Sequence, residues 1–363
     1  MTLTFESETH PAPTADSARR ELMENPAWGR VFADHMVSAR FSRGAGWHGW
    51  KIGPRRNIEL HPATSVLHYG QEIFEGLKAY RHPDGSAALF RPEANARRFR
   101  RSAERMALPP LPEAAFVESV RALVRADEGW IPSAPGASLY LRPFMIATEE
   151  ALGTKPSDDA VYAVIAAPVA DYFGGAAKAV TIWVAETFTR AAPGGTGEAK
   201  CGGNYAAGHA AQAEAQAEGC DQVVFLDAVE HRWVEELGGM NIVFVFADGS
   251  LLTPPLTGTI LPGITRDSLL TLARDLGLRV REERYSIEAW RADAASGRLA
   301  EVFACGTAAV VTPIGRIKAR GYEMTVADGG VGPVTSRLKA ALTDIQFGRA
   351  PDPHGWVERL GPA

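Results

Sequence analysis

The glycine-rich segment at residues 194–205 surrounds a single lysine and reads Gly194-Gly195-Thr196-Gly197-Glu198-Ala199-Lys200-Cys201-Gly202-Gly203-Asn204-Tyr205. Glycine lacks a Cβ atom, so this backbone can approach a bulky ligand closely. A lysine in such a loop is commonly a solvated turn residue. A desolvated lysine can instead become a neutral amine and form a Schiff base with a carbonyl compound. The segment alone leaves both interpretations of Lys200 open.

Two nucleotide-binding motifs resemble this segment but do not match it. The phosphate-binding loop of triphosphate enzymes has Gly directly before its lysine and Ser or Thr directly after it. Here the neighbours are Ala199 and Cys201. The dinucleotide fingerprint G-x-G-x-x-G, which opens a helix after a strand, does not occur. Both nucleotide classes are therefore disfavoured.

Two adjacent acids, Glu235 and Glu236, lie downstream in the run Val234–Asn241. Neighbouring side chains of a strand point to opposite faces, so at most one of these acids would serve a site. The flanking apolar residues leave open which one does. An anionic carboxylate beside a pyridine nitrogen favours protonation of that nitrogen. A Schiff-base lysine and such an acid are parts of a site for pyridoxal 5'-phosphate. We therefore predict pyridoxal 5'-phosphate as the cofactor.

A phosphate ester needs several donors at once. Gly263-Ile264-Thr265 precedes an expected helix, whose first backbone N–H groups favour an anion, although a simple helix start has the same sequence. Gly306-Thr307-Ala308 offers a hydroxyl and further N–H groups, or else a bulge in a buried strand. Arg98 could add a charge-assisted pair. Spacing does not distinguish Arg98 from three neighbours, which are Arg97, Arg100 and Arg101.

Composition is that of an ordinary globular protein of roughly two domains, with 363 residues, 46% hydrophobic and 22% charged. The net charge of −5 favours neither nucleic acid nor an anionic membrane as a partner. Apolar runs are strand-sized, so we expect no membrane span. The three cysteines form no C-x-x-C pair, so we expect neither a disulfide framework nor a metal site. The N-terminus lacks an apolar signal core, and a cytoplasmic location fits best.

Mixed strands and helices predict an α/β (mixed α+β) fold. We expect a flexible lead-in at residues 1–18, a smaller N-terminal α/β domain at 19–170, an interdomain loop at 171–179 and a larger C-terminal cofactor-binding domain at 180–363.

Apolar periodicity predicts a helix at Glu113–Asp127 whose buried face contains Phe116, Val120, Leu123 and Val124. Two further helices are predicted, a basic one at Glu93–Met106 and an alanine-rich one at Tyr205–Glu218. The stretch Gly44–Pro54, rich in Gly, Pro and Trp, predicts an irregular loop.

Taken together, the motifs resemble those of branched-chain amino-acid aminotransferases, in the fold-type-IV group of pyridoxal-phosphate enzymes. The resemblance runs from about Trp28 to the C-terminal helix. It rests on the Lys200 segment and on Leu60–Ala63, Leu67–Gly70, Phe74–Ala79, Leu139–Pro143, Glu236–Asn241, Leu261–Arg266 and Gly306–Ala308.

The resemblance implies a two-domain architecture with the cofactor between the domains. Lys200 would bind the cofactor covalently and serve as the catalytic base. Glu236 would pair with the pyridine nitrogen, and Tyr205 would hydrogen-bond the phenolic oxygen of the ring. The groups implied for the phosphate are Arg98, the backbone N–H groups of Ile264 and Thr265, and Thr307.

The same resemblance implies a substrate pocket and a partner chain. The implied pocket residues are Phe32, Tyr69, Phe74, Tyr140, Arg142, Tyr172 and the backbone of Ala308. Leu152 and Thr154 match a loop that reaches the neighbouring subunit's site, which implies a homodimer. The expected reaction is reversible, ping-pong transfer of an amino group from L-leucine, L-isoleucine or L-valine to 2-oxoglutarate. The alternatives are a D-amino-acid aminotransferase, an aminodeoxychorismate lyase, and a non-catalytic protein that binds a phosphate ligand.

Overall fold

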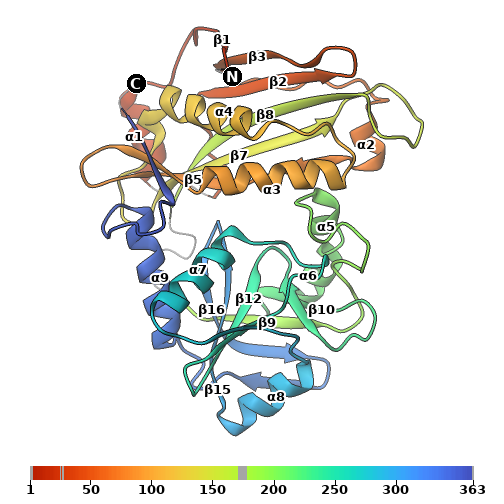
Figure 1. Ribbon diagram of the computed structural model, residues 1–363, viewed down its shortest axis with the longest axis vertical. Helices are drawn as coiled ribbons and strands as arrows, with labels where there is room; N and C mark the ends of the chain where they lie inside the picture. The colour runs from red at the N-terminus through yellow and green to blue at the C-terminus, as the bar shows by residue number, and fades with distance from the viewer. Residues whose placement is uncertain (1–2, 25, 27, 171–177, 362–363) are drawn as a thin grey trace. The chain divides into compact units, whose positions relative to one another are not determined.

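The computed structural model describes residues 3–24, 26, 28–170 and 178–361. The chain divides into two compact units (Figure 1). The first comprises Met1–Gly174, Ala199–Gly202 and Asp344–Ala363, and the second comprises Gly175–Glu198 and Gly203–Thr343. Lys200 thus belongs to the first unit, although the sequence-based boundaries place it in the C-terminal domain. Residues 171–177 of the expected interdomain loop lie outside the described residues.

The first unit is built on one largely antiparallel sheet with the strand order β1-β3-β2-β8-β7-β5-β6-β18, and β4 pairs with β7. Its strands are β1 (Glu6–Ser7), β2 (His35–Ser42), β3 (Gly46–Pro54), β4 (Glu72–Phe74), β5 (Leu77–Arg81), β6 (Ala87–Phe90), β7 (Ser138–Ala147), β8 (Asp159–Val169) and β18 (Val357–Leu360). Its helices are α1 (Asp16–Glu24), α2 (Ser65–Tyr69), α3 (Pro92–Arg105) and α4 (Glu113–Ala126), with a short 3₁₀ helix at Glu128–Trp130.

Helices α3 and α4 pack against each other, and α4 covers β2 and β8 (Figure 1). The apolar face predicted for α4 is confirmed, because Phe116, Val120, Leu123 and Val124 are all fully buried. The ring of Phe116 lies 5.2 Å from that of Phe99 on α3. Burial of these side chains stabilises the helix pair on the sheet.

The prediction of an irregular loop at Gly44–Pro54 is wrong, because residues Gly46–Pro54 form strand β3. This strand pairs antiparallel with β2 and parallel with β1. Trp47 and Trp50 lie 6.3 and 6.1 Å from the ring of Tyr162, centroid to centroid. Contacts with distant aromatic residues thus override the local glycine and proline signal.

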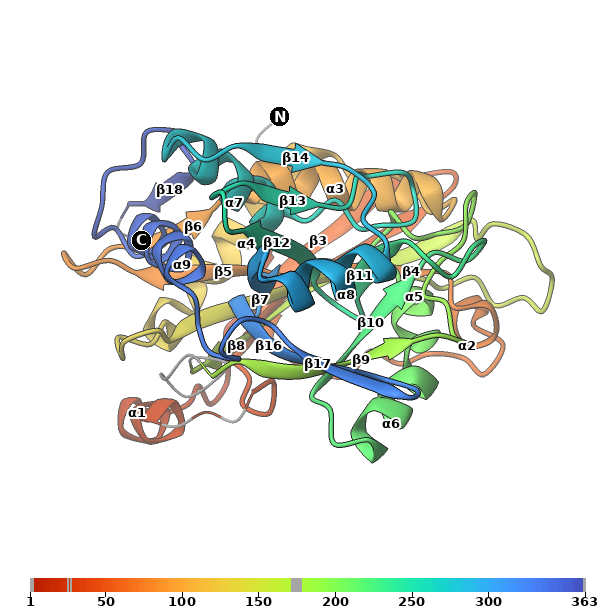
Figure 2. The same ribbon diagram turned by 90° about the horizontal axis from the view of Figure 1, so that it is seen from below.

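The second unit contains a sheet with the strand order β11-β10-β9-β16-β15-β12-β13-β14, to which β17 is added on β16 (Figure 2). Pairing of β11 with β12 closes the strands from β11 to β12 into a ring. The strands are β9 (Val180–Ala185), β10 (Gln222–Leu226), β11 (Val234–Leu237), β12 (Asn241–Phe246), β13 (Leu251–Thr253), β14 (Val280–Glu282), β15 (Leu299–Gly306), β16 (Val310–Ala319) and β17 (Tyr322–Thr325).

The helices that belong wholly or mostly to the second unit are α5 (Gly202–Ala206), α6 (His209–Ala217), α7 (Ile264–Asp275), α8 (Ile287–Ser296) and α9 (Pro333–Gln346). One helix was expected at Tyr205–Glu218, but the structure has α5 and α6 with a break at residues 207–208. Gly208 lies beside Phe225 of β10, where an added Cβ would be in ordinary contact with the ring at 3.4 Å. The break therefore positions Tyr205 on a short helix of its own.

Candidate active site

Lys200 is held by its backbone within the first unit. Its N–H donates to Oγ of Ser102 on α3 at 3.0 Å, and its carbonyl accepts from the N–H of Phe74 at 2.9 Å. Its Nζ lies 4.9 Å from the centre of the Phe74 ring. The next N–H but one, that of Gly202, donates to the carboxylate of Glu72. These contacts place the amine over an aromatic face and not at the tip of a solvated turn.

Helix α3 resolves which arginine lies near this lysine. Arg98 is buried, whereas Arg97, Arg100 and Arg101 are exposed. Arg98 stands one helical turn before Ser102, so both side chains share a face of α3. Since Ser102 accepts from the Lys200 backbone, the buried guanidinium and the lysine lie on the same side of the helix.

An aromatic and cationic group adjoins Phe74. The guanidinium of Arg142 lies 4.7 Å from the Phe74 ring centre, and its Nη2 donates to Oη of Tyr140 at 3.0 Å. Nε of Arg142 is buried and has no hydrogen-bond partner among the described residues. A buried arginine edge of this kind favours a carboxylate ligand. Burial raises the pKa of the nearby Glu72 carboxyl, while the Gly202 N–H and the charge of Arg142 partly offset that rise.

Trp28, which the sequence analysis did not name as a site residue, lies beside Tyr140. Its ring lies 5.4 Å from that of Tyr140 in an edge-to-face arrangement, and the side chain is 39% exposed. Phe32, which was predicted to line the pocket, contacts Arg55, whose guanidinium is 5.3 Å from its ring. An exposed aromatic residue just before the first long strand was the available signal. Tyr172 lies outside the described residues.

Gly76 offers a direct test of the position of Tyr140. A Cβ added at Gly76 would lie 2.0 Å from Oη of Tyr140, so Gly76→Ala must displace that ring. We expect kcat/KM for the reaction expected from the sequence to fall about tenfold or more, because small misplacement of positioning groups is costly. Gly44→Ala is the matched control, since an added Cβ there meets no atom within 4 Å. Unchanged kinetics in the Gly76→Ala variant would remove Tyr140 from the pocket.

Tyr69 is hydrogen-bonded to the loop that contains Leu152. Its hydroxyl donates to the carbonyl of Leu152 at 2.5 Å. Both side chains are exposed, Tyr69 by 42% and Leu152 by 68%, and Thr154 is exposed as well. Tyr69 and this loop therefore form one surface of the first unit.

In the second unit the two adjacent acids of β11 have different surroundings. Both Glu235 and Glu236 are buried. Oε1 of Glu236 lies 2.8 Å from Nη1 of Arg190 and accepts from the N–H of Leu261 at 2.9 Å. Glu235 accepts from the Thr259 hydroxyl, and burial raises the pKa of its carboxyl. Glu236 is therefore the acid that lies in direct contact with a buried cation, a distinction that the sequence alone left open.

Asn241 joins Glu236 to the segment before α7. Its side-chain amide donates to Oε2 of Glu236 at 2.9 Å and to the carbonyl of Leu261 at 3.0 Å. A Cβ at Gly263 would lie 1.9 Å from Oδ1 of Asn241, so only glycine fits there. The first turn of α7 begins at Ile264 and receives no side-chain cap, and its N–H groups favour an anion.

The remaining predicted residues of the second unit lie around the same strand ends. Cys305 of β15 pairs with Asn241 of β12, and the turn with Thr307 and Ala308 follows directly. An added Cβ at Gly239, in the turn after β11, would lie 3.6 Å from the ring of Tyr205. The second unit therefore brings together Tyr205, Glu236, Ile264, Thr265 and Thr307 near one end of its sheet.

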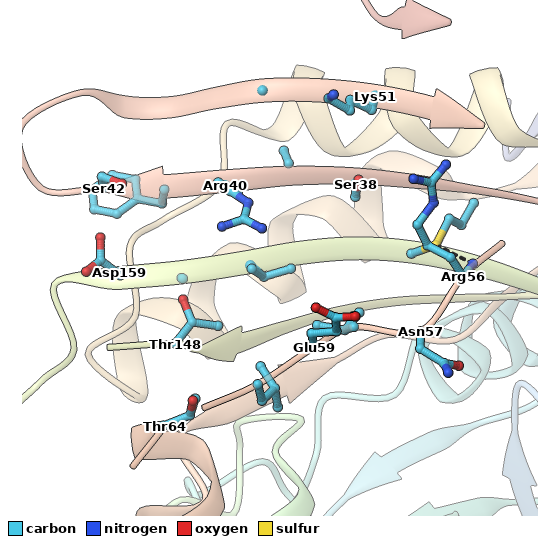
Figure 3. Close-up of a pocket in the computed structure, with 18 of the residues that line it drawn as sticks. Ser38, Arg40, Ser42, Lys51, Arg56, Asn57, Glu59, Thr64, Thr148 and Asp159 are labelled. Carbon is cyan, nitrogen blue, oxygen red and sulfur yellow. Dashed lines mark hydrogen bonds between the residues drawn. The ribbon is translucent and has the colours of Figure 1, made fainter. Parts of the chain in front are cut away.

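A cavity of about 800 Å³ lies elsewhere in the first unit, against β2, β3, β8 and residues 56–64 (Figure 3). Its lining includes the positively charged Arg40 and Arg56 and the negatively charged Glu59 and Asp159. None of the predicted site residues lines it. Within the described part of the chain, no three His, Cys, Asp or Glu side chains are arranged to hold a metal ion.

The chain matches the family model described as amino-transferase class IV over residues 72–317. It is 54% identical over 360 residues to a protein of Streptomyces coelicolor named "Probable branched-chain-amino-acid aminotransferase", covering 99% of both chains. It is 52% identical over 362 residues to the branched-chain-amino-acid aminotransferase of Mycolicibacterium smegmatis, covering 99% of this chain and 98% of the relative.

Solved structures agree with these relatives. The Escherichia coli branched-chain amino acid aminotransferase matches with a TM-score of 0.75 at 29% identity, over 90% of this chain and 98% of that one. The Thermobaculum terrenum enzyme in its PLP-bound form matches with a TM-score of 0.72 at 25% identity, over 90% and 98%. The fold expected from sequence, a two-domain fold-type-IV arrangement, is confirmed. By its family model, its full-length relatives and its fold, this chain belongs to the class IV aminotransferases and, among them, to the branched-chain-amino-acid aminotransferases.

Proposed function

We propose that this protein reversibly transfers the amino group of L-leucine, L-isoleucine or L-valine to 2-oxoglutarate. The identity of 54% with a relative of that name, over 99% of both chains, supports this function most strongly. The local geometry of Lys200 and Glu236 agrees with it. Neither the relatives nor the solved structures favour a D-amino-acid aminotransferase, an aminodeoxychorismate lyase or a non-catalytic binding protein.

The residues present fit pyridoxal 5'-phosphate, the cofactor of this family. Lys200 supplies the amine, and Glu236 is a carboxylate kept in place by Arg190, Asn241 and Leu261. In the proposed arrangement Glu236 pairs with the pyridine nitrogen and Tyr205 donates to the phenolic oxygen. The phosphate is bound by Arg98, the N–H groups of Ile264 and Thr265, and Thr307.

Bound pyridoxal phosphate supplies an electron-withdrawing ring that makes negative charge at the substrate α-carbon tolerable. Lys200 would hold the cofactor through Nζ. The same Nζ would be the base that moves the proton between the substrate α-carbon and the cofactor carbon. Glu236 would favour protonation of the ring nitrogen by its opposite charge, and its bonds to Arg190, Asn241 and Leu261 hold that carboxylate in place.

One pocket must accept an aliphatic side chain and, in the second half-reaction, the carboxylate of glutamate. The rings of Phe74, Tyr140 and Trp28 offer apolar surface, worth about 0.8 kcal/mol for each buried methylene. Arg142 and Oη of Tyr140 offer donors to the carboxylate. The backbone of Ala308 borders the substrate as well.

The activity is tested with purified protein, leucine and 2-oxoglutarate. We expect 4-methyl-2-oxopentanoate and glutamate as products, with ping-pong kinetics. D-Alanine in place of leucine is the matched control and should give far slower turnover. Turnover of D-alanine in preference to leucine would support the D-amino-acid alternative and contradict this proposal.

A homodimer in the cytoplasm completes the proposal. Leu152, Tyr69 and Leu67 expose apolar side chains on one surface of the first unit, by 68%, 42% and 58%. Such a surface is suited to a second copy of the chain. Because Tyr69 is hydrogen-bonded to Leu152, it accompanies Leu152 and Thr154 toward the neighbouring subunit's site.

The cysteines Cys201, Cys220 and Cys305 are unpaired and buried, as suits a reducing compartment. No described helix has the length and apolar character needed to cross a bilayer.

A further inference from the structure

Glu75 stands in the motif Phe74-Glu75-Gly76, and the proposed function gives it no role. Its side chain is 0% exposed. Nε of Arg98 donates to Oε1 of Glu75 at 2.6 Å, and Nη2 of Arg98 donates to Oε2 at 2.8 Å. The N–H of Gly76 adds a third bond to Oε2 at 3.0 Å, and the N–H of Glu75 itself donates to the Pro143 carbonyl at 2.7 Å.

Two hydrogen bonds join Arg98 to Glu75, and two further bonds hold Glu75 in place. A fork of two parallel N–H···O bonds fixes the plane of a guanidinium as well as its position. The carboxylate is in turn fixed by Gly76 and by the backbone bond to β7. Arginine has five N–H donors, and the fork to Glu75 uses two of them. The same plane therefore sets the direction of the outer edge of Arg98.

Charge alone does not explain a carboxylate at this position. Next to a phosphate-binding arginine, a negative charge opposes the anion by Coulomb repulsion. Orientation of the arginine instead strengthens phosphate binding, because a preorganised arginine loses less rotamer freedom when the phosphate binds. A buried ion pair is also costly to form, so stability gives little reason for it. The geometry favours orientation as the larger effect.

We propose that Glu75 is a positioning residue that holds Arg98 in the orientation needed for the cofactor phosphate. This inference rests on the role proposed above for Arg98. It predicts an effect on ligands that contain the phosphate and not on the same ring without it.

The test compares the affinities of the full-length chain, depleted of cofactor, for pyridoxal 5'-phosphate and for pyridoxal. Glu75→Gln keeps the shape of the side chain but places an amide N–H against a guanidinium N–H. We expect the Kd of pyridoxal phosphate to rise about tenfold to a hundredfold, as for other supporting residues, with the Kd of pyridoxal unchanged. Glu75→Asp keeps the charge, but its side chain is too short for both bonds. Its Kd for pyridoxal phosphate should lie between those of the wild type and Glu75→Gln. It also provides the test if Glu75→Gln fails to fold.

Asp127→Asn is the matched control, because Asp127 is an equally buried carboxylate of the first unit whose partner is His35, at 2.7 Å. It should lower stability without changing the ratio of the two affinities. An equal loss for both ligands in Glu75→Gln, no loss, or tighter binding of pyridoxal phosphate would overturn the inference.

Arg98→Gln separates this inference from the proposed function. If Arg98→Gln leaves the ratio of affinities unchanged, the phosphate role of Arg98 is wrong. If Arg98→Gln abolishes the preference for the phosphate while Glu75→Gln does not, only the inference about Glu75 is wrong. The double variant should be no weaker than Arg98→Gln alone, because both changes act through one contact.

Discussion

Lys200→Ala is expected to lower the turnover of leucine by about a thousandfold or more. The variant loses both the amine that binds the cofactor covalently and the base that moves the α-proton, and the base alone contributes about 10²–10⁴ in rate. The change should spare the fold, since the hydrogen bonds that residue 200 makes with Ser102 and Phe74 use backbone atoms, which alanine keeps. Steady-state kinetics and a mass measurement after borohydride reduction provide the readouts. The wild type should be tagged at Lys200, and the variant should not.

Lys51→Ala is the control for this experiment. Lys51 is 51% exposed and pairs with Glu6 on the surface, where such pairs contribute little. Its removal should change neither the turnover nor the borohydride tag. Near-normal activity of Lys200→Ala, or a tag on another lysine, would show that the catalytic assignment is wrong.

Glu236→Gln is the second large effect, with a fall in kcat of about 10²–10³. Gln cannot be anionic, so the ring nitrogen loses the charge that favours its protonation. The variant also leaves Arg190 without the counter-charge that lies 2.8 Å away in a buried place. Removal of one member of a buried pair costs about 3–5 kcal/mol, so unfolding by urea should shift as well. The absorption spectrum of the bound cofactor as a function of pH reports the ring separately from the fold.

Glu235→Gln provides the matched comparison, since it removes the adjacent and similarly buried acid. Its carboxyl accepts from Thr259, and burial raises its pKa, so the neutral amide is a close substitute. Turnover should stay near that of the wild type. If Glu235→Gln lost as much activity as Glu236→Gln, the assignment of the two acids would have to be reversed.

Local signals in the sequence predicted several elements well. The helices at Pro92–Arg105 and Glu113–Ala126 follow from apolar periodicity, which depends only on neighbours along the chain. Strand β3 could not be found in this way, because Trp47 and Trp50 are placed by Tyr162, far away in sequence. Strand β18 also escaped notice, since a short segment acquires its strand state by pairing with β6.

The candidate site likewise has features that the sequence indicated and features that only the tertiary structure decided. The order and identity of its motifs, with Lys200 between glycines and an acid pair downstream, were enough to indicate the family, its cofactor and its reaction, because reactive groups are a property of residue type. Which of several like residues has the favoured surroundings was decided by the tertiary structure. Arg98 is the buried arginine of α3, and Glu236 is the acid beside Arg190. Burial and partner charges come from segments distant in sequence, and these set ionisation and orientation.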